Sequence, residues 1–381
     1  MIWQNIFLAY ISLFTLGLAD NIRGPLYPEI LRYFDLTNST GSMVFAIFSL
    51  ASFFGALSST RLLRIWNLYQ MLTFAAITMA VGLFVMSLSP SFYVLLFGSA
   101  LVGFSFGPMG TSQNSLVVLG AEPVNRIRWM SGLHTCYGIA SFLAPLIVAG
   151  VADYESPWRW GLGSVGIAAI ILAVICFSIK KPAVPARVVP VDKGFGFLRR
   201  EFHLTAVMSF YVIAEILVGS RLAQYMRLEM DSDLRHSSYA VTAFFVLMVV
   251  GRMATSFFHF PWKLRTGMVV SLVTTLLSLI AGMYIHPYFL ILSGLTMAPF
   301  FAWIMTYVST VFHHSVEKTI SLALSLNSFF IVIMHMSVGQ ITDNGGIWWA
   351  MILAPVFILI SLVLLITFKE APVAAEAGAN A

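Results

Sequence analysis

Charged residues and cysteines are scarce in this chain. Of its 381 residues, 10% are charged and two are cysteine, whereas 59% are hydrophobic. Soluble domains carry roughly 25% charged residues, so the composition excludes an ordinary soluble fold. Both cysteines, Cys136 and Cys176, lie within apolar stretches. This placement is typical of small hydrophobic side chains rather than of a disulfide framework.

The sequence also lacks the motifs that mark several enzyme classes. It contains no Gly-Lys-Ser/Thr phosphate loop, no HExxH and no CxxC pair. No soluble segment is long enough for an ATPase domain. We therefore expect a protein that is not an enzyme and that needs no cofactor or metal. Any uphill transport would draw on an ion gradient or on the gradient of the solute itself.

What the chain has instead is twelve apolar stretches between Ile6 and Phe368. A helix needs about 20 apolar residues to cross a bilayer, and backbone groups in lipid must pair within their own segment. Residues 1–5 contain no Lys or Arg, so we expect the first helix to be a retained span rather than a signal peptide. The sequence predicts an all-α membrane protein with transmembrane helices over 4–28, 39–62, 68–89, 91–115, 129–152, 158–179, 202–226, 237–258, 266–285, 287–311, 318–341 and 346–368.

Lys and Arg are distributed unevenly between the two sides of these helices. Of the 21 in the chain, fourteen fall on one side, six fall on the other, and Arg252 lies within a span. The richer side is expected to face the cytoplasm, which places both termini there. This distribution explains the net charge of +5 better than a nucleic-acid partner does. We expect a multi-pass protein of the inner membrane.

The longest loop divides the chain into two halves. Residues 180–201 carry three prolines and six Lys or Arg against two acids, which is typical of a linker. We therefore predict an N-terminal six-helix bundle over 1–179, a cytoplasmic linker over 180–201 and a C-terminal six-helix bundle over 202–368. The tail, 369–381, has no apolar face and is expected to be disordered.

Short patterns recur in equivalent positions of the two halves. Residues 151–153, Val-Ala-Asp, are followed by a Trp, and Ile-Thr-Asp with a following Trp recurs 190 residues later at 341–343. Phe48 and Gly55 match Phe244 and Gly251 at a shift of 196. These matches indicate duplication. Two parallel six-helix repeats are a transporter architecture that holds its substrate between the halves at mid-depth.

Ionisable side chains within spans are costly and few, so each is a candidate functional residue. Glu215 lies near the middle of span 202–226, with no basic residue three or four positions away. A buried carboxylate without a partner can hold a proton near neutral pH; the alternative is a pair with a neighbouring helix. Asp20 is the second proton-coupling candidate, although Arg23, three residues on, offers a structural ion pair instead.

Other polar and aromatic residues of the spans are candidates for binding the substrate. For each, packing or an interhelical hydrogen bond is the alternative interpretation. His335 is a candidate proton relay or a structural histidine, and Arg23, Arg221 and Arg252 are candidates for gating or for structural ion pairs, with Arg252 expected to latch helices on the cytoplasmic side. The substrate-binding candidates are Asn21, Gln113, Asn114, His134, Tyr137, Gln224, Trp303, Tyr307 and Asn327.

The six-plus-six layout with a basic central loop resembles the major facilitator superfamily. Within it, several stretches are similar to the fucose permease group of sugar–proton symporters. The stretch Leu-His-Thr-Cys-Tyr-Gly-Ile-Ala-Ser at 133–141 resembles that group's fifth helix, 211–215 with Gly251-Arg252 its seventh and eighth, and 298–300 its tenth. The resemblance implies the major facilitator fold, a sugar substrate and proton symport.

Two functions are consistent with these observations. The first is proton-coupled symport of a small polar solute, a sugar above all, by alternating access in a monomer. The second is a proton-coupled antiporter that exports drugs or metabolites, which the 32 Phe and 19 Met would suit. Both need a small-molecule substrate, protons and a lipid bilayer, and neither involves nucleic acid.

Overall fold

The computed structural model describes residues 1–179, 199–257, 263–312 and 316–369. All regular structure in these ranges is helical. The N-terminal half contains α1 (Trp3–Asn21), α2 (Arg23–Phe34), α3 (Asn38–Ile65), α4 (Leu68–Ser87), α5 (Phe92–Gly120), a short 3₁₀ turn (Pro123–Asn125), α6 (Arg126–Gly150) and α7 (Pro157–Ser178). The C-terminal half contains α8 (Arg199–Glu229), α9 (Leu234–Phe257), α10 (Leu264–Tyr284), α11 (Tyr288–Val311), α12 (Val316–Gly345), α13 (Ile347–Met351) and α14 (Leu353–Thr367).

Two of the predicted spans are each interrupted at one residue that keeps helical backbone angles. α1 and α2 meet at Ile22, and α13 and α14 meet at Ile352. With α1 and α2 counted as one unit, and α13 and α14 as another, eleven helical units of the described chain are long and apolar enough to cross a membrane. α12, with 30 residues, is the twelfth long helix. The predicted all-α architecture of twelve helices is therefore confirmed.

Most predicted span ends agree with the structure within a few residues. The largest difference is at the end of the first span, because α2 continues to Phe34 whereas the sequence predicted an end at 28. Pro25 does not stop this helix, since it lies in the first turn of α2, where a backbone N–H has no helical partner to lose. Pro28 lies inside α2 and is also accommodated.

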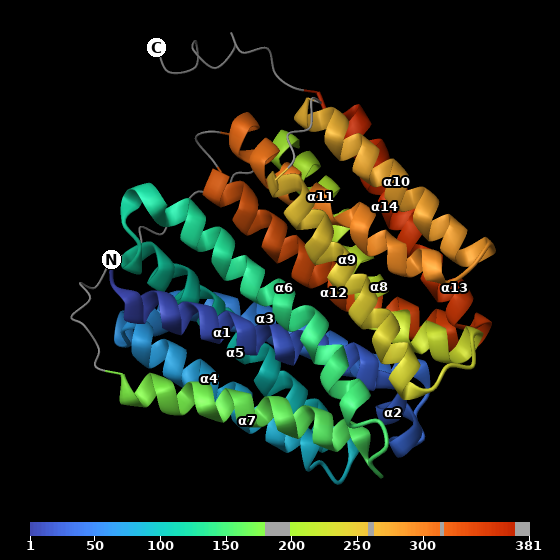
Figure 1. Ribbon diagram of the computed structural model, residues 1–381, viewed down its shortest axis with the longest axis horizontal. Coiled ribbons are helices and arrows are strands. Elements are labelled where there is room, and N and C mark those ends of the chain that lie inside the picture. The colour runs from blue at the N-terminus through green and yellow to red at the C-terminus, as the bar shows by residue number, and fades with distance from the viewer. Residues whose placement is uncertain (180–198, 258–262, 313–315, 370–381) are drawn as a thin grey trace.

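The buried apolar side chains form two separate cores. One is built from residues 6–176, with Leu234 added from the other half, and the second from residues 204–368. Figure 1 shows the two groups of helices side by side, blue to green and yellow to red. The same helix crossing recurs in both: a Cβ on Gly103 would lie 2.2 Å from the Phe48 carbonyl oxygen, and one on Gly294 would lie 2.2 Å from that of Phe244. The two bundles are thus pseudo-symmetric.

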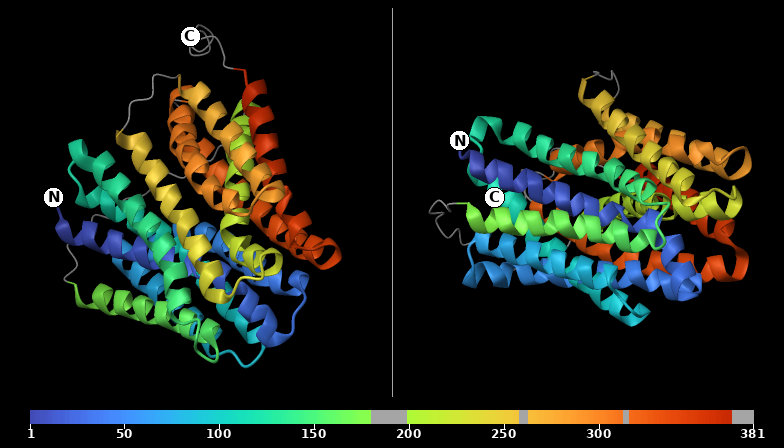
Figure 2. Two further views of the ribbon diagram at one scale, coloured as in Figure 1. Left: turned by 45° about the vertical axis from the view of Figure 1, so that its right-hand side comes forward. Right: turned by 60° about the horizontal axis from the view of Figure 1, so that its bottom comes forward.

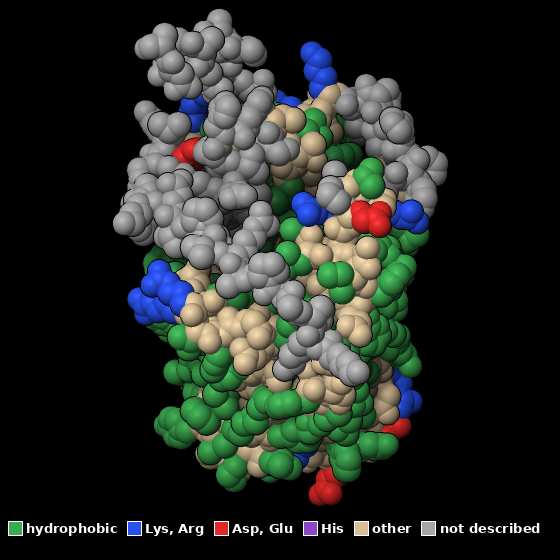
Figure 3. Space-filling view, turned by 90° about the vertical axis from the view of Figure 1, so that its left-hand side faces the viewer, with side chains coloured by type: hydrophobic (Ala, Val, Ile, Leu, Met, Phe, Trp, Pro, Cys, Tyr) green, Lys and Arg blue, Asp and Glu red, His purple; other side chains and the backbone are tan. Residues whose placement is uncertain are grey.

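The two ends of the molecule differ. We call the end that carries Trp3, Thr367 and the turn at 66–67 the terminal end, and the end that carries the turns at 35–37, 151–156 and 230–233 the distal end. The two halves converge at the distal end and diverge towards the terminal end (Figure 2, left). Exposed basic side chains lie on the terminal end, beside a broad hydrophobic surface (Figure 3); they include Arg61, Arg64, Arg126, Arg128, Lys263 and Lys369.

Candidate functional site

Three polar side chains on either side of the α1–α2 junction, those of Asp20, Asn21 and Arg23, lie between the two halves. Asn21, the last residue of α1, donates through Nδ2 to the Gly17 carbonyl at 2.9 Å and to Ser141 Oγ at 3.1 Å. Gly24, just after the junction, lets the backbone approach α8, since a Cβ there would lie 3.1 Å from the Gly219 carbonyl oxygen.

A cavity of about 230 Å³ lies at this junction. It is walled by α1, α2, α3, α5 and α6 on one side and by α8, α9 and α12 on the other. This volume is slightly below the range of about 300–1,000 Å³ for drug-sized ligand pockets, which indicates a small solute. Aromatic side chains form much of the apolar wall, and the polar wall consists of Asp20, Asn21, Arg23, Ser49, Ser52, Tyr137, Ser141, Glu215, Ser220, Arg252, Ser328 and His335.

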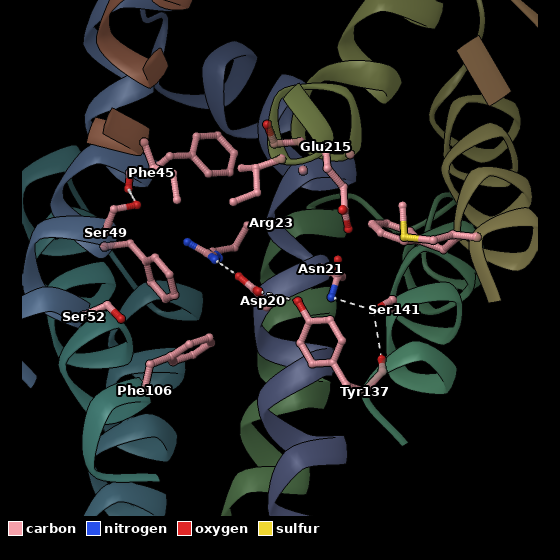
Figure 4. Close-up of a pocket in the computed structure, with 18 of the residues that line it drawn as sticks. Asp20, Asn21, Arg23, Phe45, Ser49, Ser52, Phe106, Tyr137, Ser141 and Glu215 are labelled. Atoms are coloured by element: carbon pink, nitrogen blue, oxygen red, sulfur yellow. Dashed lines mark hydrogen bonds and ion pairs between the residues drawn. The ribbon is translucent and has the colours of Figure 1, made fainter. Parts of the chain in front are cut away.

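Asp20 is the centre of a tight network in the N-terminal half. Its Oδ1 accepts from Arg23 Nη2 at 2.5 Å, and its Oδ2 accepts from the Tyr137 hydroxyl at 2.7 Å. Arg23 is almost fully buried, donates through Nε to the Ala19 carbonyl, and stacks its guanidinium 3.4 Å from the centroid of the Phe48 ring. The structural ion pair that the sequence offered for Asp20 is therefore present, and it faces the cavity (Figure 4).

Glu215 and Arg252 form the corresponding pair in the C-terminal half. Arg252 Nη2 lies 3.3 Å from Glu215 Oε1, so α9 supplies the basic partner that the sequence near Glu215 lacks. Of the two interpretations left open for Glu215, the structure shows the pair with a neighbouring helix. Arg252 lines the cavity and joins α9 to α8 through this ion pair. Sequence reasoning missed this pair because its members are 37 residues apart on different helices.

The charges that line the cavity balance. Each half supplies one carboxylate and one guanidinium, from Asp20 with Arg23 and from Glu215 with Arg252. The side chains of Asp20, Asn21, Tyr137 and Glu215 are directed towards one another (Figure 4). A site with balanced charge gives no net attraction to an anion or a cation, but it offers many donors and acceptors to hydroxyl groups.

Polar contacts between the halves gather beyond the cavity, at the distal end. Arg221 Nη2 donates to Ser42 Oγ at 2.7 Å and stacks 4.1 Å from the ring centroid of Tyr27. Glu29 on α2 forms an ion pair with Arg227 on α8. The structure thus places Arg221 in this distal contact, together with Gln224, which donates to the Asn38 side chain.

The structure brings only part of the predicted site together. Asn21, Tyr137 and the four ion-pair residues line the cavity. The remaining substrate-binding candidates are absent from its lining: Gln113, Asn114, His134, Gln224, Trp303, Tyr307 and Asn327.

Several of these candidates are absent from the cavity lining because their side chains lie on other faces of their helices. Gln113 is buried within the N-terminal half, where it accepts from Ser12 at 3.2 Å, and Asn114 is exposed. Trp303 packs on Gly267 and Tyr307 lies 6.2 Å from the ring of Phe368, inside the C-terminal core. The expected stacking face for a substrate is therefore part of helix packing in this conformation.

Several lining residues escaped the sequence interpretation. Ser49 and Ser52 of α3 and Ser220 of α8 carry no signal that separates them from ordinary small residues of a membrane helix. The sequence contains 32 phenylalanines, and nothing marks Phe45 as a cavity residue; Phe48 was noted only for its match to Phe244. His335 was a candidate relay, and the structure places it in the lining, stacked 4.7 Å from the ring centroid of Phe45.

Two six-helix halves with a polar cavity between them are typical of a membrane transporter. The family model of the Major Facilitator Superfamily matches residues 9–316. The chain belongs to this superfamily, and it is a multi-span membrane transporter rather than an enzyme.

Similar proteins include sugar transporters. The chain is 23% identical over 394 residues to the glucose/mannose transporter GlcP of Bacillus subtilis (strain 168), and the alignment covers 97% of each chain. Among solved structures, a D-xylose-proton symporter matches with a TM-score of 0.80 at 11% identity, covering 97% of this chain and 98% of that one. The inward-open xylose transporter XylE of E. coli matches with a TM-score of 0.77 at 12% identity, covering 98% of each chain. The structural matches establish the fold.

Proposed function

We propose that the protein is a proton-coupled symporter of a small neutral polar solute, with a monosaccharide as the preferred class. The observation that carries the proposal is the cavity between the halves, where each half supplies one carboxylate–guanidinium pair. The balanced charge favours a neutral solute over an organic ion. The hydroxyl and amide groups suit a polyhydroxylated ring, and the aromatic wall suits its apolar face.

The similarity to GlcP supports the choice of a sugar. Its printed name is that of a glucose and mannose transporter, and the match extends over nearly all of both chains. The symporter of D-xylose and protons shares the fold. An export function would use the same frame, so the direction of flux is part of the test.

Within this proposal, Glu215 is the proton carrier and Asp20 is the fixed partner of Arg23. Asp20 accepts two short hydrogen bonds from groups in its own half, so its partners move with it. Glu215 meets Arg252 at a longer distance, across two helices. Movement of α9 against α8 would separate that guanidinium from Glu215, so Glu215 is the carboxylate whose pairing can change during transport.

Coupling then follows from the pairing of Arg252. Protonation of Glu215 removes its charge and weakens its attraction for Arg252, whose Nη2 can then turn towards the cavity. A solute hydroxyl can accept from that donor, so solute binds better when the proton is bound. This mutual dependence of two affinities is what symport requires. If the basic terminal end faces the cytoplasm, as the Lys and Arg distribution predicts, the conformation described above is the one that releases solute inward.

Uptake by proteoliposomes tests the proposal. A panel of labelled neutral sugars, sugar acids and amino sugars is offered with and without an imposed proton gradient. We expect saturable, gradient-stimulated accumulation of at least one neutral sugar. Glu215→Gln should abolish accumulation but retain exchange of solute down its own gradient, whereas Glu229→Gln, an exposed acid on the same helix, should behave as the unchanged protein.

Other results would overturn parts of this proposal. Accumulation that survives in Glu215→Gln would transfer the proton role to Asp20. Gradient-driven loss of a preloaded apolar compound, with no sugar flux, would establish the export alternative. Selective uptake of charged sugars would show that the charge balance of the cavity does not set the substrate class.

A further inference from the structure

Two aspartates that recur in the sequence occupy related positions at the distal end. Asp153 follows the end of α6, and Asp343 lies in the last turn of α12, 190 residues later. Each reaches across to the other half. Asp153 contacts Arg235 in the first turn of α9, and Asp343 contacts the first turn of α3. Because α3 and α9 are equivalent helices of the two repeats, the two aspartates make the same crossing with the halves exchanged.

Asp343 caps α3 from the opposite half. Its Oδ1 accepts from the backbone N–H of Asn38 at 2.7 Å and from Asn38 Nδ2 at 2.9 Å. Its Oδ2 accepts from the backbone N–H of Ser39 at 2.8 Å and from the Ser39 hydroxyl at 2.6 Å. The first N–H groups of a helix have no partner within the helix and carry partial positive charge, so a carboxylate is stabilised there.

α3 does not need Asp343 in order to begin. Thr37, its own N-cap residue, accepts from the backbone N–H of Thr40 at 3.2 Å. The two N–H groups that Asp343 takes are those of Asn38 and Ser39, at the exposed distal surface, where water can replace the carboxylate. The contact can therefore break and reform without unravelling the helix, as a contact between moving halves must.

The symmetry-related contact of Asp153 is much weaker. It consists of one ion pair with Arg235, and the two side chains are 77% and 40% exposed. Exposed pairs of this kind contribute little, because water and salt screen them and two long side chains must be ordered. The two repeats thus keep the same crossing but give it unequal strength.

Close packing of α12 against α3 also holds the two halves together at the distal end. Gly339 lies four residues before Asp343 on α12, and a Cβ there would lie 2.4 Å from Ser42 Oγ and 2.6 Å from the Asn38 carbonyl oxygen. Only a glycine lets the α12 backbone come this close to α3. The aspartate and the glycine therefore act on the same contact, one through charge and one through close approach.

We propose that Asp153 and Asp343 form an unequal pair of latches that hold the distal end closed. The contact of Asp343 with α3 contributes most to the equilibrium between the closed and the open distal end. This inference concerns the motion of the two halves and does not depend on the solute or the coupling ion. Its test needs no substrate, so its outcome is separate from that of the proposed sugar symport.

Distances between spin labels on the two halves measure the opening. Leu88→Cys, directly after α4, and Ile285→Cys, directly after α10, lie on distal turns of the two halves. Their side chains are 72% and 75% exposed, and both are labelled in a background without Cys136 and Cys176. Addition of Asp343→Asn removes the charge and replaces one of the two accepting oxygens by an NH₂ group that cannot accept from its donors. We expect it to lower the ratio of closed to open molecules about fivefold.

The matched control is the symmetry-related aspartate. Asp153→Asn should change the ratio of closed to open molecules by less than about twofold. Equal shifts in Asp343→Asn and Asp153→Asn, or no shift in Asp343→Asn, would overturn the proposal.

If Asp343→Asn does not fold, a second variant tests the contact between Asp343 and α3 from the side of α3. Asn38→Pro removes two of the four donors that Asp343 uses, namely the backbone N–H and the side-chain amide of Asn38. Proline suits the first position of a helix, and Thr37 has the extended ψ of 159° that a following proline requires. It should open the distal end in the same direction as Asp343→Asn but to a smaller extent, because the two donors of Ser39 remain. Gln224→Ala controls for the other contact of the Asn38 side chain. An Asn38→Pro protein that stays as closed as Gln224→Ala would refute the latch.

Discussion

In the N-terminal half, Arg23 Nη2 lies 2.5 Å from Asp20 Oδ1, with both residues at the α1–α2 junction. Tyr137 adds a second hydrogen bond to the carboxylate of Asp20. In the C-terminal half, Glu215 and Arg252 lie 3.3 Å apart on two different helices. A pair at the α1–α2 junction keeps its geometry when the halves move, whereas a pair between helices changes with each shift of one helix against the other. We therefore interpret the first pair as a structural anchor and the second as the variable element of the cavity.

The packing of the helices around the two ion pairs, which we call the frame, is nevertheless nearly the same in the two halves. In both halves a glycine lets one helix cross another at the backbone, with Gly103 on Phe48 and Gly294 on Phe244. Duplication therefore conserved the packing and changed the chemistry at the interface. We expect variants of the frame to behave alike in the two halves and variants of the ion pairs to behave differently.

The largest effect on stability should follow from removal of the buried cation of the anchor. Arg23→Met leaves Asp20 without its guanidinium and also loses the stacking on Phe48. Removing one member of a buried pair costs about 3–5 kcal/mol, and Asp20 is about a third exposed, so we expect the lower end, about 3 kcal/mol. Thermal unfolding in detergent measures the loss.

The double variant separates charge from packing. Asp20→Asn combined with Arg23→Met leaves no unpaired charge, so it should be less destabilised than Arg23→Met alone. In the other half, Arg252→Met should be milder, because Glu215 and Arg252 are more loosely paired and Arg252 is 34% exposed. Equal losses in Arg23→Met and Arg252→Met would contradict the assignment of anchor and variable element.

The frame should respond in the same way in both halves. Gly103→Ala and Gly294→Ala each place a Cβ 2.2 Å from a backbone carbonyl oxygen, so the helices must separate. Such overpacking costs about 1–3 kcal/mol, and we expect about 2 kcal/mol for each. Gly110→Ala, on the same helix as Gly103, has open space around the new Cβ and should leave the melting temperature unchanged or raise it. A large loss in only one of the two halves would break the equivalence of the bundles.

How far the sequence predicts these features depends on their range along the chain. Apolar stretches of about 20 residues determine the helices locally, which is why α4, α7 and α11 lie within two residues of their predicted ends. The pairing of Glu215 with Arg252 depends on how two helices rotate against each other, which no local pattern encodes. The contact of Asp343 with α3 joins residues 305 apart. The matched patterns at 151–153 and 341–343 predicted that these positions correspond, but not what they touch.

The hydroxyl of Tyr137 should make a smaller contribution than Arg23. Tyr137→Phe removes one of two hydrogen bonds to Asp20 and keeps the ring in place. Hydrogen bonds to charged groups contribute about 1.5–3 kcal/mol, and because Arg23 still binds the carboxylate we expect about 1.5 kcal/mol. Tyr10→Phe, which loses a hydrogen bond to the neutral Trp129 carbonyl, is the control and should cost less. If Tyr10→Phe is the more harmful change, the Tyr137 hydroxyl is not part of the anchor.

The smallest effect concerns how the two equivalent helices α3 and α9 begin. α3 is capped by Thr37 and from the other half by Asp343, whereas Asp233 caps α9 locally. The backbone N–H and the imidazole of His236 both bond to Asp233, at 2.7 and 2.8 Å, and these bonds lower the pKa of this carboxyl. Asp233 lies in the distal turn before α9 and is largely exposed, so the contribution to stability is small.

The sign of this effect follows from the lowered pKa. A carboxyl whose pKa is lower in the folded state stabilises the fold at pH above its ordinary range near 3.9, and this contribution disappears as the pH falls through the folded-state value. Asp233→Asn should therefore lower the melting temperature slightly at pH 7 and have no effect at strongly acidic pH. Because Asp233 acts within its own half, Asp233→Asn should also leave the distance between labels at positions 88 and 285 unchanged, and a shift towards the open state would show that local and crossing caps are not separate devices.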